Sequence, residues 1–583
     1  MANTVAIGIQ NFEKMIEKKC FYVDKTAFIK EWWESQDDVT LITRPRRFGK
    51  TLNMSMLECF FSVKYADRGE LFEGLSIWED EEYRKLQGTY PVISLSFANV
   101  KETNFENTRH IINQLISGIY SNSLYLLDSP NLEEHEKKYI KRIAEQETDL
   151  PDTILTMSLH RLAELLFKHY GKKVIILLDE YDTPMQEAYV CGYWEELVHF
   201  TRSLFNSTFK TNPYLERAVM TGITRVSKES IFSDLNNPEV VTTTSNKYTT
   251  AFGFTEEEVF TALETYGYGD QRNEVKYWYD GFVFGKQRDI YNPWSIVQFL
   301  DKGKFDIYWA NTSSNSLVST LIQKGSKTIK ASFEALLKGE TIFCSIDEQI
   351  VFHQLDRSEG AVFSLLLASG YLKALSKENM ETKVDSGRPK YELAITNHEI
   401  KCMIEYMVHD WFEETEEEYN EFVKALLSGD IEAMNEYMNL VAEELFSSFD
   451  TGKKPSRRQP ERFYHGFVLG LIVELAGKYT VTSNRESGFG RYDVVIEPKD
   501  KKEDAIILEF KVFNANKEKS LEETVQSALA QIEEKKYEAD LIARGFGKEQ
   551  IRKYGFAFEG KHVLIGEQSI CFTEKALDGK SRE

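Results

Sequence analysis

A nine-residue stretch, TRPRRFGKT (residues 43–51), constrains the fold more than any other part of the chain. The apolar segment VTLITR (residues 39–44) leads into it, and TLNMSMLECFF (residues 51–61) continues with helical character. At a strand-to-helix turn of this kind, backbone N–H groups point at an anion, the lysine adds charge and the following hydroxyl holds Mg²⁺. A second triplet, Gly-Lys-Ser at residues 579–581, has neither a strand before it nor a helix after it. We therefore expect a phosphate site at the first triplet.

The first glycine of the pattern GxxxxGK[ST] is missing, because Arg44 stands in its place. Pro45 fixes its own φ at about −65° and favours an extended conformation for Arg44, so the loop is expected to have its own geometry. The two arginines that follow would add positive charge near the phosphates, although an orientation toward solvent stays open. The nucleotide-binding residues that we predict here are Arg46, Arg47, Phe48, Gly49, Lys50, Thr51 and Leu52.

The segment KVIILLDEYD (residues 173–182) predicts a buried strand that ends in two carboxylates. Ligands bind at the carboxyl ends of strands in such sheets, so Asp179 is expected to hold Mg²⁺ together with Thr51. Glu180 is expected to polarise the attacking water. Two acids after a strand are commonly no more than an exposed strand end, but the upstream Gly-Lys-Thr favours a hydrolytic site. Thr221 and Arg225, in MTGITRV, are predicted to sense the γ-phosphate.

The 583 residues are too many for one hydrophobic core, and their pattern changes along the chain. Residues 1–250 alternate apolar segments with helical stretches, which predicts an α/β fold with a parallel sheet and helices on both faces. The expected strands are residues 39–44, 91–97, 173–179 and 217–223.

The later part of the chain follows other patterns. Thr255 and Glu258 form a capping box that opens a helix, and we expect a helical lid at residues 251–330 and a mostly helical connecting region at residues 331–452. The stretch TGKKPSRRQP is typical of a boundary. Residues 453–583 are therefore expected to form a separate, small α/β domain.

Several motifs occur in order: FYVDKT (21–26), ITRPRRFGKT (42–51), VIILLDEYD (174–182), TGITRVSKESIFSDLNN (221–237), WYDGF (278–282) and IYNPWSI (290–296). Together they resemble the bacterial AAA-ATPase-like family, whose loop has the same Arg-Pro-Arg-Arg-Phe form; the resemblance runs from about Ile7 to about Gly285. It implies a P-loop NTPase-like fold that binds ATP, in which the absent first glycine is a family trait. In that family the chain commonly continues into a nuclease domain of the PD-(D/E)XK superfamily, a restriction-endonuclease-like α/β fold.

The C-terminal carboxylates fit this implication. Asp493 lies on the expected strand YDVVIEP (residues 492–498), and Glu509 and Lys511 lie two apart on AIILEFKVF (residues 505–513), so they share one face. If the strands pair as a hairpin, the three side chains converge. Carboxylates gather Mg²⁺, and the lysine orients the nucleophile or stabilises developing charge.

The specificity of that pattern is limited. Glu-x-Lys within a strand is usually a salt-bridged edge, and Asp493 is not preceded by the proline of the superfamily motif. The aspartate upstream, the glycine-flanked turn and Gln531 on the following helix favour catalysis. The predicted metal ligands of this domain are Glu486, Asp493 and Glu509, and the predicted catalytic residues of the chain are Glu180, Asp493, Glu509 and Lys511.

The composition limits the partners. A formal net charge of −22 excludes a protein that is basic all over, although it allows a local basic groove. The six cysteines have no CxxC spacing and no apolar run approaches the ~18 residues of a membrane span, which favours a cytoplasmic protein without membrane association. We expect ATP and Mg²⁺ as cofactors and nucleic acid as a partner, DNA in preference to RNA. Whether the chain forms a homo-oligomer stays open.

The leading hypothesis is an ATP-hydrolysing module that controls a Mg²⁺-dependent nuclease, with a defence role implied by family resemblance only. One alternative is a signalling NTPase whose C-terminal domain binds nucleic acid or a partner without cutting; Glu509 and Lys511 weigh against it. Another is a nuclease-fold protein with an inactive ATPase, which the presence of Lys50, Asp179 and Glu180 disfavours.

Overall fold

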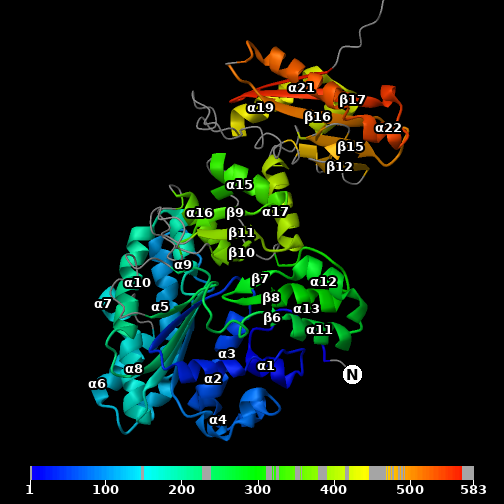
Figure 1. The fold of residues 1–583 in the computed structure, drawn as a ribbon. Coiled ribbons are helices and arrows are strands. Elements are labelled where there is room, and N and C mark those ends of the chain that lie inside the picture. The colour runs from blue at the N-terminus through cyan, green and yellow to red at the C-terminus, as the bar shows by residue number, and fades with distance from the viewer. Residues whose placement is uncertain are drawn as a thin grey trace, which may run out of the picture. The chain divides into compact units, whose positions relative to one another are not determined.

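The computed structural model of the chain describes residues 3–145, 150–225, 238–309, 318, 321–322, 327–347, 355, 358–377, 390–413, 419–445, 468, 471–472, 475, 478–483, 486–487, 490–491, 493–515 and 517–567. The chain divides into two compact units. One comprises Met1–Leu321 and Gly339–Met403, and the other comprises Ile322–Lys338 and Ile404–Glu583. Each unit contains its own sheets (Figure 1).

The first unit is built on a five-stranded sheet in the order β2-β3-β4-β1-β5, in which every pairing is parallel. Its strands are β1 (Val39–Thr43), β2 (Val92–Ser96), β3 (Val174–Asp179), β4 (Leu215–Gly222) and β5 (Glu239–Val241). Both β1 and β3 are buried along their whole length, as apolar strands covered on both faces should be. The four strands expected from the sequence are confirmed, and β5 extends the sheet at the edge next to β1.

Helices cover the two faces of this sheet. Figure 1 shows α5, α8 and α10 on one side and α2 and α3 on the other. The helices before β5 are α1 (Phe12–Glu17), α2 (Ala27–Ser35), α3 (Lys50–Phe61), α4 (Glu81–Leu86), α5 (Phe105–Ser121), α6 (Glu134–Ala144), α7 (Asp152–Leu155), α8 (Ser158–Tyr170), α9 (Thr183–Cys191) and α10 (Trp194–Phe209). The observed architecture is the α/β fold that the alternating pattern predicts.

A smaller subdomain follows β5. It contains α11 (Glu256–Thr265), α12 (Arg272–Tyr279) and α13 (Pro293–Lys302), together with a three-stranded antiparallel sheet of β6 (Phe254–Thr255), β8 (Gln287–Tyr291) and β7 (Phe282–Phe284). The capping box of Thr255 and Glu258 is formed in both directions, as the sequence predicts. The lid is thus helical with a small sheet; strands of two to five residues are too short to show a clear period of two.

The connecting region, expected to be mostly helical, also contains a small sheet. Between α16 (Glu359–Ala368) and α17 (His398–Glu413) it contains β10 (Leu372–Lys377) and β11 (Lys390–Ile395), and β11 also pairs with β9 (Ile342–Ser345). Tyr391 and Leu393 on β11 are buried, so the strand does alternate, but over six residues that pattern is weak against the helices on either side.

The second unit holds a mixed five-stranded sheet in the order β12-β15-β16-β17-β18. Its strands are β12 (Tyr479–Ser483), β15 (Val494–Pro498), β16 (Ala505–Val512), β17 (Ile551–Glu559) and β18 (His562–Glu567), and only β16 and β17 pair in parallel. Its helices are α15 (Lys327–Leu337), α18 (Tyr419–Ser428), α19 (Ile431–Leu445), α21 (Leu521–Lys535) and α22 (Ala539–Ala543). The small α/β domain expected from the sequence is therefore present.

Alternation along β16 separates two hydrophobic clusters. Ile506, Leu508 and Phe510 pack with residues of α18 and α19, whereas Ala505 and Ile507 pack with residues of α21. Because α18 and α19 belong to this core, the division of the chain falls within α17, between Met403 and Ile404, whereas the sequence reading placed a boundary near residue 452. The helices described here include none that is both long and apolar enough to span a membrane.

Candidate functional site

The stretch between β1 and α3 forms a tight loop, as its strand and helix flanks predict. Gly49 precedes α3 with φ of 81°, and Arg47 is also left-handed with φ of 64°. A left-handed residue at the end of such a loop turns successive N–H groups inward, and Gly49 adopts this conformation without a Cβ clash. The backbone therefore has the local shape of an anion-binding turn at the start of a helix.

Arg44, in the place of the missing glycine, is fully buried and anchors the loop to a distant segment. One guanidinium nitrogen donates to the carbonyls of Thr43 (3.1 Å) and Thr242 (2.6 Å), and another donates to Lys247 (3.2 Å). The guanidinium also lies 4.4 Å from the ring centroid of Phe284. Burial lowers the pKa of Arg44 to about 9, so the side chain remains a cation at neutral pH.

Lys50 lies inside the loop and is 4% exposed. Its ammonium donates to the carbonyl oxygens of Arg44 (3.0 Å) and Pro45 (2.9 Å). Burial lowers the pKa of Lys50, while the carboxylates of Glu180 and Asp179 oppose that shift. The charge is thus held at the centre of the turn, where an anion would meet it.

Asp179 joins three elements at the carboxyl edge of the sheet. Its Oδ2 accepts a hydrogen bond from the hydroxyl of Thr51 (2.8 Å) on α3, and its Oδ1 accepts one from the hydroxyl of Thr221 on β4. Burial raises the pKa of Asp179, and these two hydroxyls act against the rise. A hydroxyl and a carboxylate are hard oxygen donors of the kind that Mg²⁺ prefers, so the predicted metal pair is brought together.

Glu180 follows directly in a left-handed conformation, with φ of 51°. Its carboxylate accepts from the hydroxyl of Thr183 (3.1 Å), and its backbone N–H donates to Thr221 Oγ1 (3.3 Å). Non-glycine residues are uncommon in this region of φ and, where they occur, often belong to functional sites. The strained backbone turns Glu180 away from the line of β3.

Asp182 is a buried acid to which the sequence reading gave no role. Its Oδ2 accepts from the backbone N–H groups of Ile223 (3.0 Å) and Thr224 (2.8 Å) and from the hydroxyl of Thr224 (2.8 Å). These bonds fix the exit from β4 that leads to Arg225. The sequence feature that could have pointed to Asp182 is its position as the third acid of Asp-Glu-Tyr-Asp, just after the end of β3.

The two arginines of the loop are bound to neighbours. Arg46 donates to Gln186 Oε1 on α9 (3.2 Å), and the Arg47 guanidinium lies 4.5 Å from the centroid of the Trp294 ring. Phe48 is buried, with its ring centroid 4.7 Å from that of Phe282. The Phe48 side chain therefore packs in the lid, and the phosphate contact predicted for Phe48 would have to come from its backbone.

Leu52, the last of the predicted contacts, is half-buried in the first turn of α3. Arg225 lines a cavity of about 20 Å³ together with Thr43, Thr242 and Ser364. A space of this size holds about one water molecule. The residues after Arg225 in the motif TGITRVSKESIFSDLNN, 226–237, lie outside the described part of the chain.

In the second unit, β15 and β16 form the expected antiparallel hairpin. Val494 pairs with Leu508 and Val495 with Ile507, so the register continued by one residue places Asp493 opposite Glu509. Directly opposed side chains lie on the same face of a sheet. Odd-numbered residues of β16 face α21, so Lys511 shares this face as well.

Gln531, on α21, connects two of these side chains. Its Nε2 donates to Glu509 Oε1, and its Oε1 accepts from the Lys511 ammonium (2.8 Å). Glu509 is 2% exposed, and Asp493 Oδ2 accepts from the backbone N–H of Phe510 (2.9 Å). The structure thus brings Glu509 and Lys511 together through one amide.

The electrostatic environment of Asp493 includes a residue that sequence reasoning missed. Burial raises the pKa of the Asp493 carboxyl, and the ammonium groups of Lys338 and Lys511 oppose the rise. Lys338 follows α15, which belongs to the same unit although it precedes Asp493 by more than a hundred residues in the chain. Only the fold could reveal this neighbour.

Glu486 lies in a separate two-stranded hairpin of β13 (Glu486–Ser487) and β14 (Gly490–Arg491), where it pairs with Arg491. Its side chain lies outside the described part of the structure. Its role as a metal ligand therefore stays a prediction.

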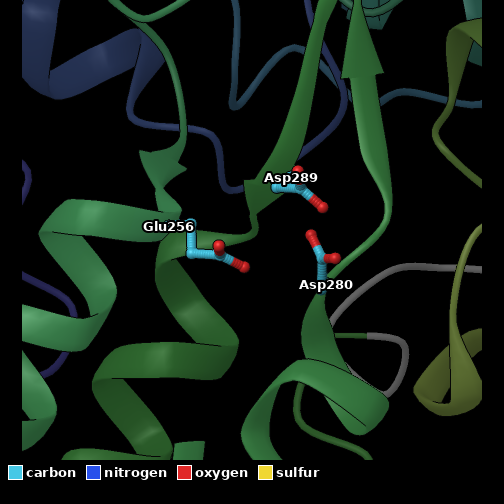
Figure 2. Close-up of side chains that lie close together, drawn as sticks. All are labelled: Glu256, Asp280 and Asp289. Atoms are coloured by element: carbon cyan, nitrogen blue, oxygen red, sulfur yellow. The ribbon is translucent and has the colours of Figure 1, made fainter. Parts of the chain in front are cut away.

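A third group of acids, in the lid, was not expected. Glu256, Asp280 and Asp289 each place one oxygen within 4.8 Å of the others (Figure 2). The ammonium of Lys276 contacts all three, including Asp289 at 3.3 Å and Asp280 at 3.9 Å. Burial, followed by a hydrogen bond with Asp289, raises the pKa of Asp280 to about 7. With a lysine among the carboxylates, this group is an ion-pair network.

Comparison with known proteins adds family information to this geometry. Residues 6–232 match the family described as "Predicted AAA-ATPase", and residues 459–568 match the PD-(D/E)XK nuclease superfamily. Over 403 residues the chain is 25% identical to "Uncharacterized protein in vnfD 5'region" from Azotobacter chroococcum mcd 1, an alignment that covers 68% of each protein. The two family matches confirm the resemblance found in the motifs.

Proposed function

Because the chain joins an N-terminal AAA-ATPase-like domain to a C-terminal PD-(D/E)XK nuclease superfamily domain, we propose that it binds and hydrolyses ATP and thereby controls cleavage of nucleic acid phosphodiesters. The observation that carries the proposal is that each unit has its own lysine and carboxylates at one place. In the first unit these are Lys50 and Asp179, and in the second they are Lys511, Glu509 and Asp493.

In the first unit, the loop would bind the triphosphate through the backbone N–H groups of its left-handed turn at Arg47 and Gly49. The Lys50 ammonium now donates to the carbonyl oxygens of Arg44 and Pro45. On nucleotide binding it would donate to phosphate oxygens instead. The residues that would hold Mg²⁺ are Thr51 and Asp179, already hydrogen-bonded to each other. Glu180 would orient the attacking water.

In the second unit, Asp493 and Glu509 would hold Mg²⁺ on the face of the sheet that is covered by α21. At both sites a bound Mg²⁺ ion would neutralise negative charge on the phosphate oxygens and would lower the pKa of a water molecule bound to it. Lys511, fixed by Gln531, would orient the water or stabilise charge on the pentavalent phosphate. Gln531, whose amide is hydrogen-bonded to both side chains, would hold Glu509 and Lys511 in a fixed position relative to each other.

We further propose DNA in preference to RNA as the substrate and, by family resemblance, a role against foreign DNA. The net charge of −22 supports tight control, because a negatively charged chain does not bind nucleic acid by default.

The test is a cleavage assay with single- and double-stranded DNA and RNA, with and without ATP and Mg²⁺. We expect Mg²⁺-dependent cleavage that ATP changes, loss of cleavage in Lys511→Ala, and loss of the ATP effect in Lys50→Ala. ATP turnover without cleavage of any substrate would contradict the nuclease assignment and favour a switch that binds without cutting.

A further inference from the structure

Two lid residues hold one carbonyl of the nucleotide loop. The indole Nε1 of Trp309 donates to the backbone oxygen of Arg46 (2.9 Å), and Asn292 Nδ2 donates to the same oxygen (3.3 Å). Both donors lie beyond the region that matches the ATPase family, residues 6–232. The orientation of the loop backbone therefore depends on the lid.

Trp309 is itself fixed by packing and by a buried acid. It is 2% exposed, and its ring centroid lies 5.8 Å from that of Phe282 and 5.6 Å from that of Tyr371. The backbone N–H groups of Tyr308 and Trp309 donate to Glu399 Oε1, at 2.7 and 2.6 Å. A shift of Trp309 would therefore disturb Glu399.

Glu399 is 1% exposed and also accepts, through Oε2, the hydroxyl hydrogen of Ser295 (2.8 Å). Ser295 lies on α13, whose N-cap is Asn292, the second donor to Arg46. A carboxylate is tolerated at this depth only where protein donors replace water. The motif IYNPWSI (residues 290–296) and the segment NHEI (residues 397–400) thus meet at the carboxylate of Glu399, which accepts from Ser295.

Glu399 is the second residue of α17, and α17 is continuous across the division between the two units at Met403 and Ile404. A helix holds its residues in fixed relation through its own hydrogen bonds, so a change at its first turn is passed along its axis. The chain therefore has a covalent, helical connection between the residue that supports the loop and the unit with the nuclease-type acids.

We infer that Glu399 is a positioning residue that links the state of the nucleotide loop to the nuclease unit through Trp309 and α17. This inference rests on the proposed function. Phosphate binding would draw Lys50 away from the carbonyls of Arg44 and Pro45, next to the carbonyl that Trp309 holds. The loop's adjustment is then passed to Glu399 and, through α17, to the second unit.

Trp309→Phe tests the link, because it removes the indole N–H and keeps an aromatic ring against Phe282 and Tyr371. Trp32→Phe is a matched control, since the buried indole of Trp32 donates to Thr40 Oγ1 in the same unit. Glu399→Ala should act like Trp309→Phe. Glu399→Gln should be close to wild type, because its amide oxygen can accept both N–H groups and its NH₂ can donate to Ser295.

Two readouts are measured on the full chain. The first is cleavage with and without ATP: we expect the ATP-dependent change to fall at least threefold in Trp309→Phe, with cleavage in the absence of ATP unaltered. The second is amide hydrogen exchange of residues 398–413 with and without a non-hydrolysable ATP analogue. We expect the analogue to alter exchange in the wild type and in Trp32→Phe, and not in Trp309→Phe or Glu399→Ala.

The inference is overturned if Trp309→Phe retains the wild-type ATP response and the wild-type exchange change in α17. If the wild type cleaves nothing, the proposed nuclease function fails, while the exchange measurement still decides the link. Should Glu399→Ala fail to fold, Trp309→Phe carries the test, with Trp32→Phe and Glu399→Gln as the controls that should keep the wild-type response.

Discussion

The hydroxyl of Thr51 donates a 2.8 Å hydrogen bond to the carboxylate of Asp179, a residue 128 positions further along the chain. This bond connects the first turn of α3 to the end of β3. It follows from the parallel sheet, in which β4 separates β1 from β3 and all three strands end at the same edge. The fold therefore brings two residues of the predicted nucleotide site, Thr51 and Asp179, into direct contact.

Thr51→Val tests this pair, because valine has the shape of threonine without the hydroxyl. We expect kcat for ATP hydrolysis to fall by about 100-fold, since a metal-ligating oxygen is lost. Thr51→Ser keeps the hydroxyl and should remain within about threefold of wild type. Steady-state ATP turnover measures both; a fully active valine variant would contradict the metal assignment.

Gln531→Leu removes the amide that bridges Glu509 and Lys511. We expect Mg²⁺-dependent cleavage to fall by about 10- to 100-fold, the usual effect of losing a group that orients metal ligands. Glu534→Leu, at an exposed position on the same helix, is the control and should leave cleavage near the wild-type rate. Equal rates for the two variants would show that Gln531 does not position the site.

Asn435 and Asn439, on α19, protect the edge strand β18. Asn435 accepts from the N–H of Ile565 (2.7 Å) and donates to its carbonyl (2.9 Å), and Asn439 bonds Val563 in the same way. Edge strands otherwise expose unpaired backbone groups. Asn435→Ala should lower the free energy of unfolding by about 1–3 kcal/mol in urea titrations, because both groups of Ile565 lose their partner.

The control for that variant lies on the same helix. Glu436 is exposed, so Glu436→Ala should change the free energy of unfolding by less than about 0.5 kcal/mol. If Asn435→Ala is as stable as this control, the hydrogen bonds from the Asn435 side chain to β18 do not contribute to the free energy of unfolding.

The pH dependence of stability is predicted from Asp280. Burial raises its pKa from 3.8 to about 7, so between these values the folded state keeps a proton that the unfolded state has released. The free energy of unfolding should therefore fall as pH rises from about 4 to 7, and level off above pH 7. Asp280→Asn should remove roughly 1 kcal/mol of this decline.

The comparison is made by urea unfolding at several pH values. Asp67→Asn, at an exposed position, controls for the change in net charge. A wild type and an Asp280→Asn variant with parallel pH profiles would show that Asp280 is not protonated in the folded state at pH 5–6.

Much of the fold could be predicted because its strands coincide with short segments that have a recognisable local sequence pattern. The run VIILLD coincides with β3, and YTVTS coincides with β12, since each is an apolar or β-branched segment of strand length. The capping box at Thr255 could be read because its two partners are three residues apart. Glu509 and Lys511 could be paired because strand geometry fixes their common face.

Other features depend on residues far apart in the chain. Arg44 could be seen to replace a glycine, but its acceptors, the carbonyls of Thr242 and Lys247, lie about two hundred positions away. The acids of the lid come from α11, the end of α12 and β8, which no local pattern connects. Trp309 and Glu399 have no nucleotide-binding chemistry, and only tertiary contacts reveal that they support the loop.

The central claim, two lysine-and-acid sites in one chain with the first controlling the second, is tested most directly by one cleavage assay. Wild type, Lys50→Ala and Lys511→Ala are incubated with labelled DNA and Mg²⁺, with and without ATP. We predict ATP-responsive cleavage by the wild type, cleavage without ATP response by Lys50→Ala, and no cleavage by Lys511→Ala. Cleavage by Lys511→Ala at the wild-type rate, or an unchanged ATP response in Lys50→Ala, would contradict the claim.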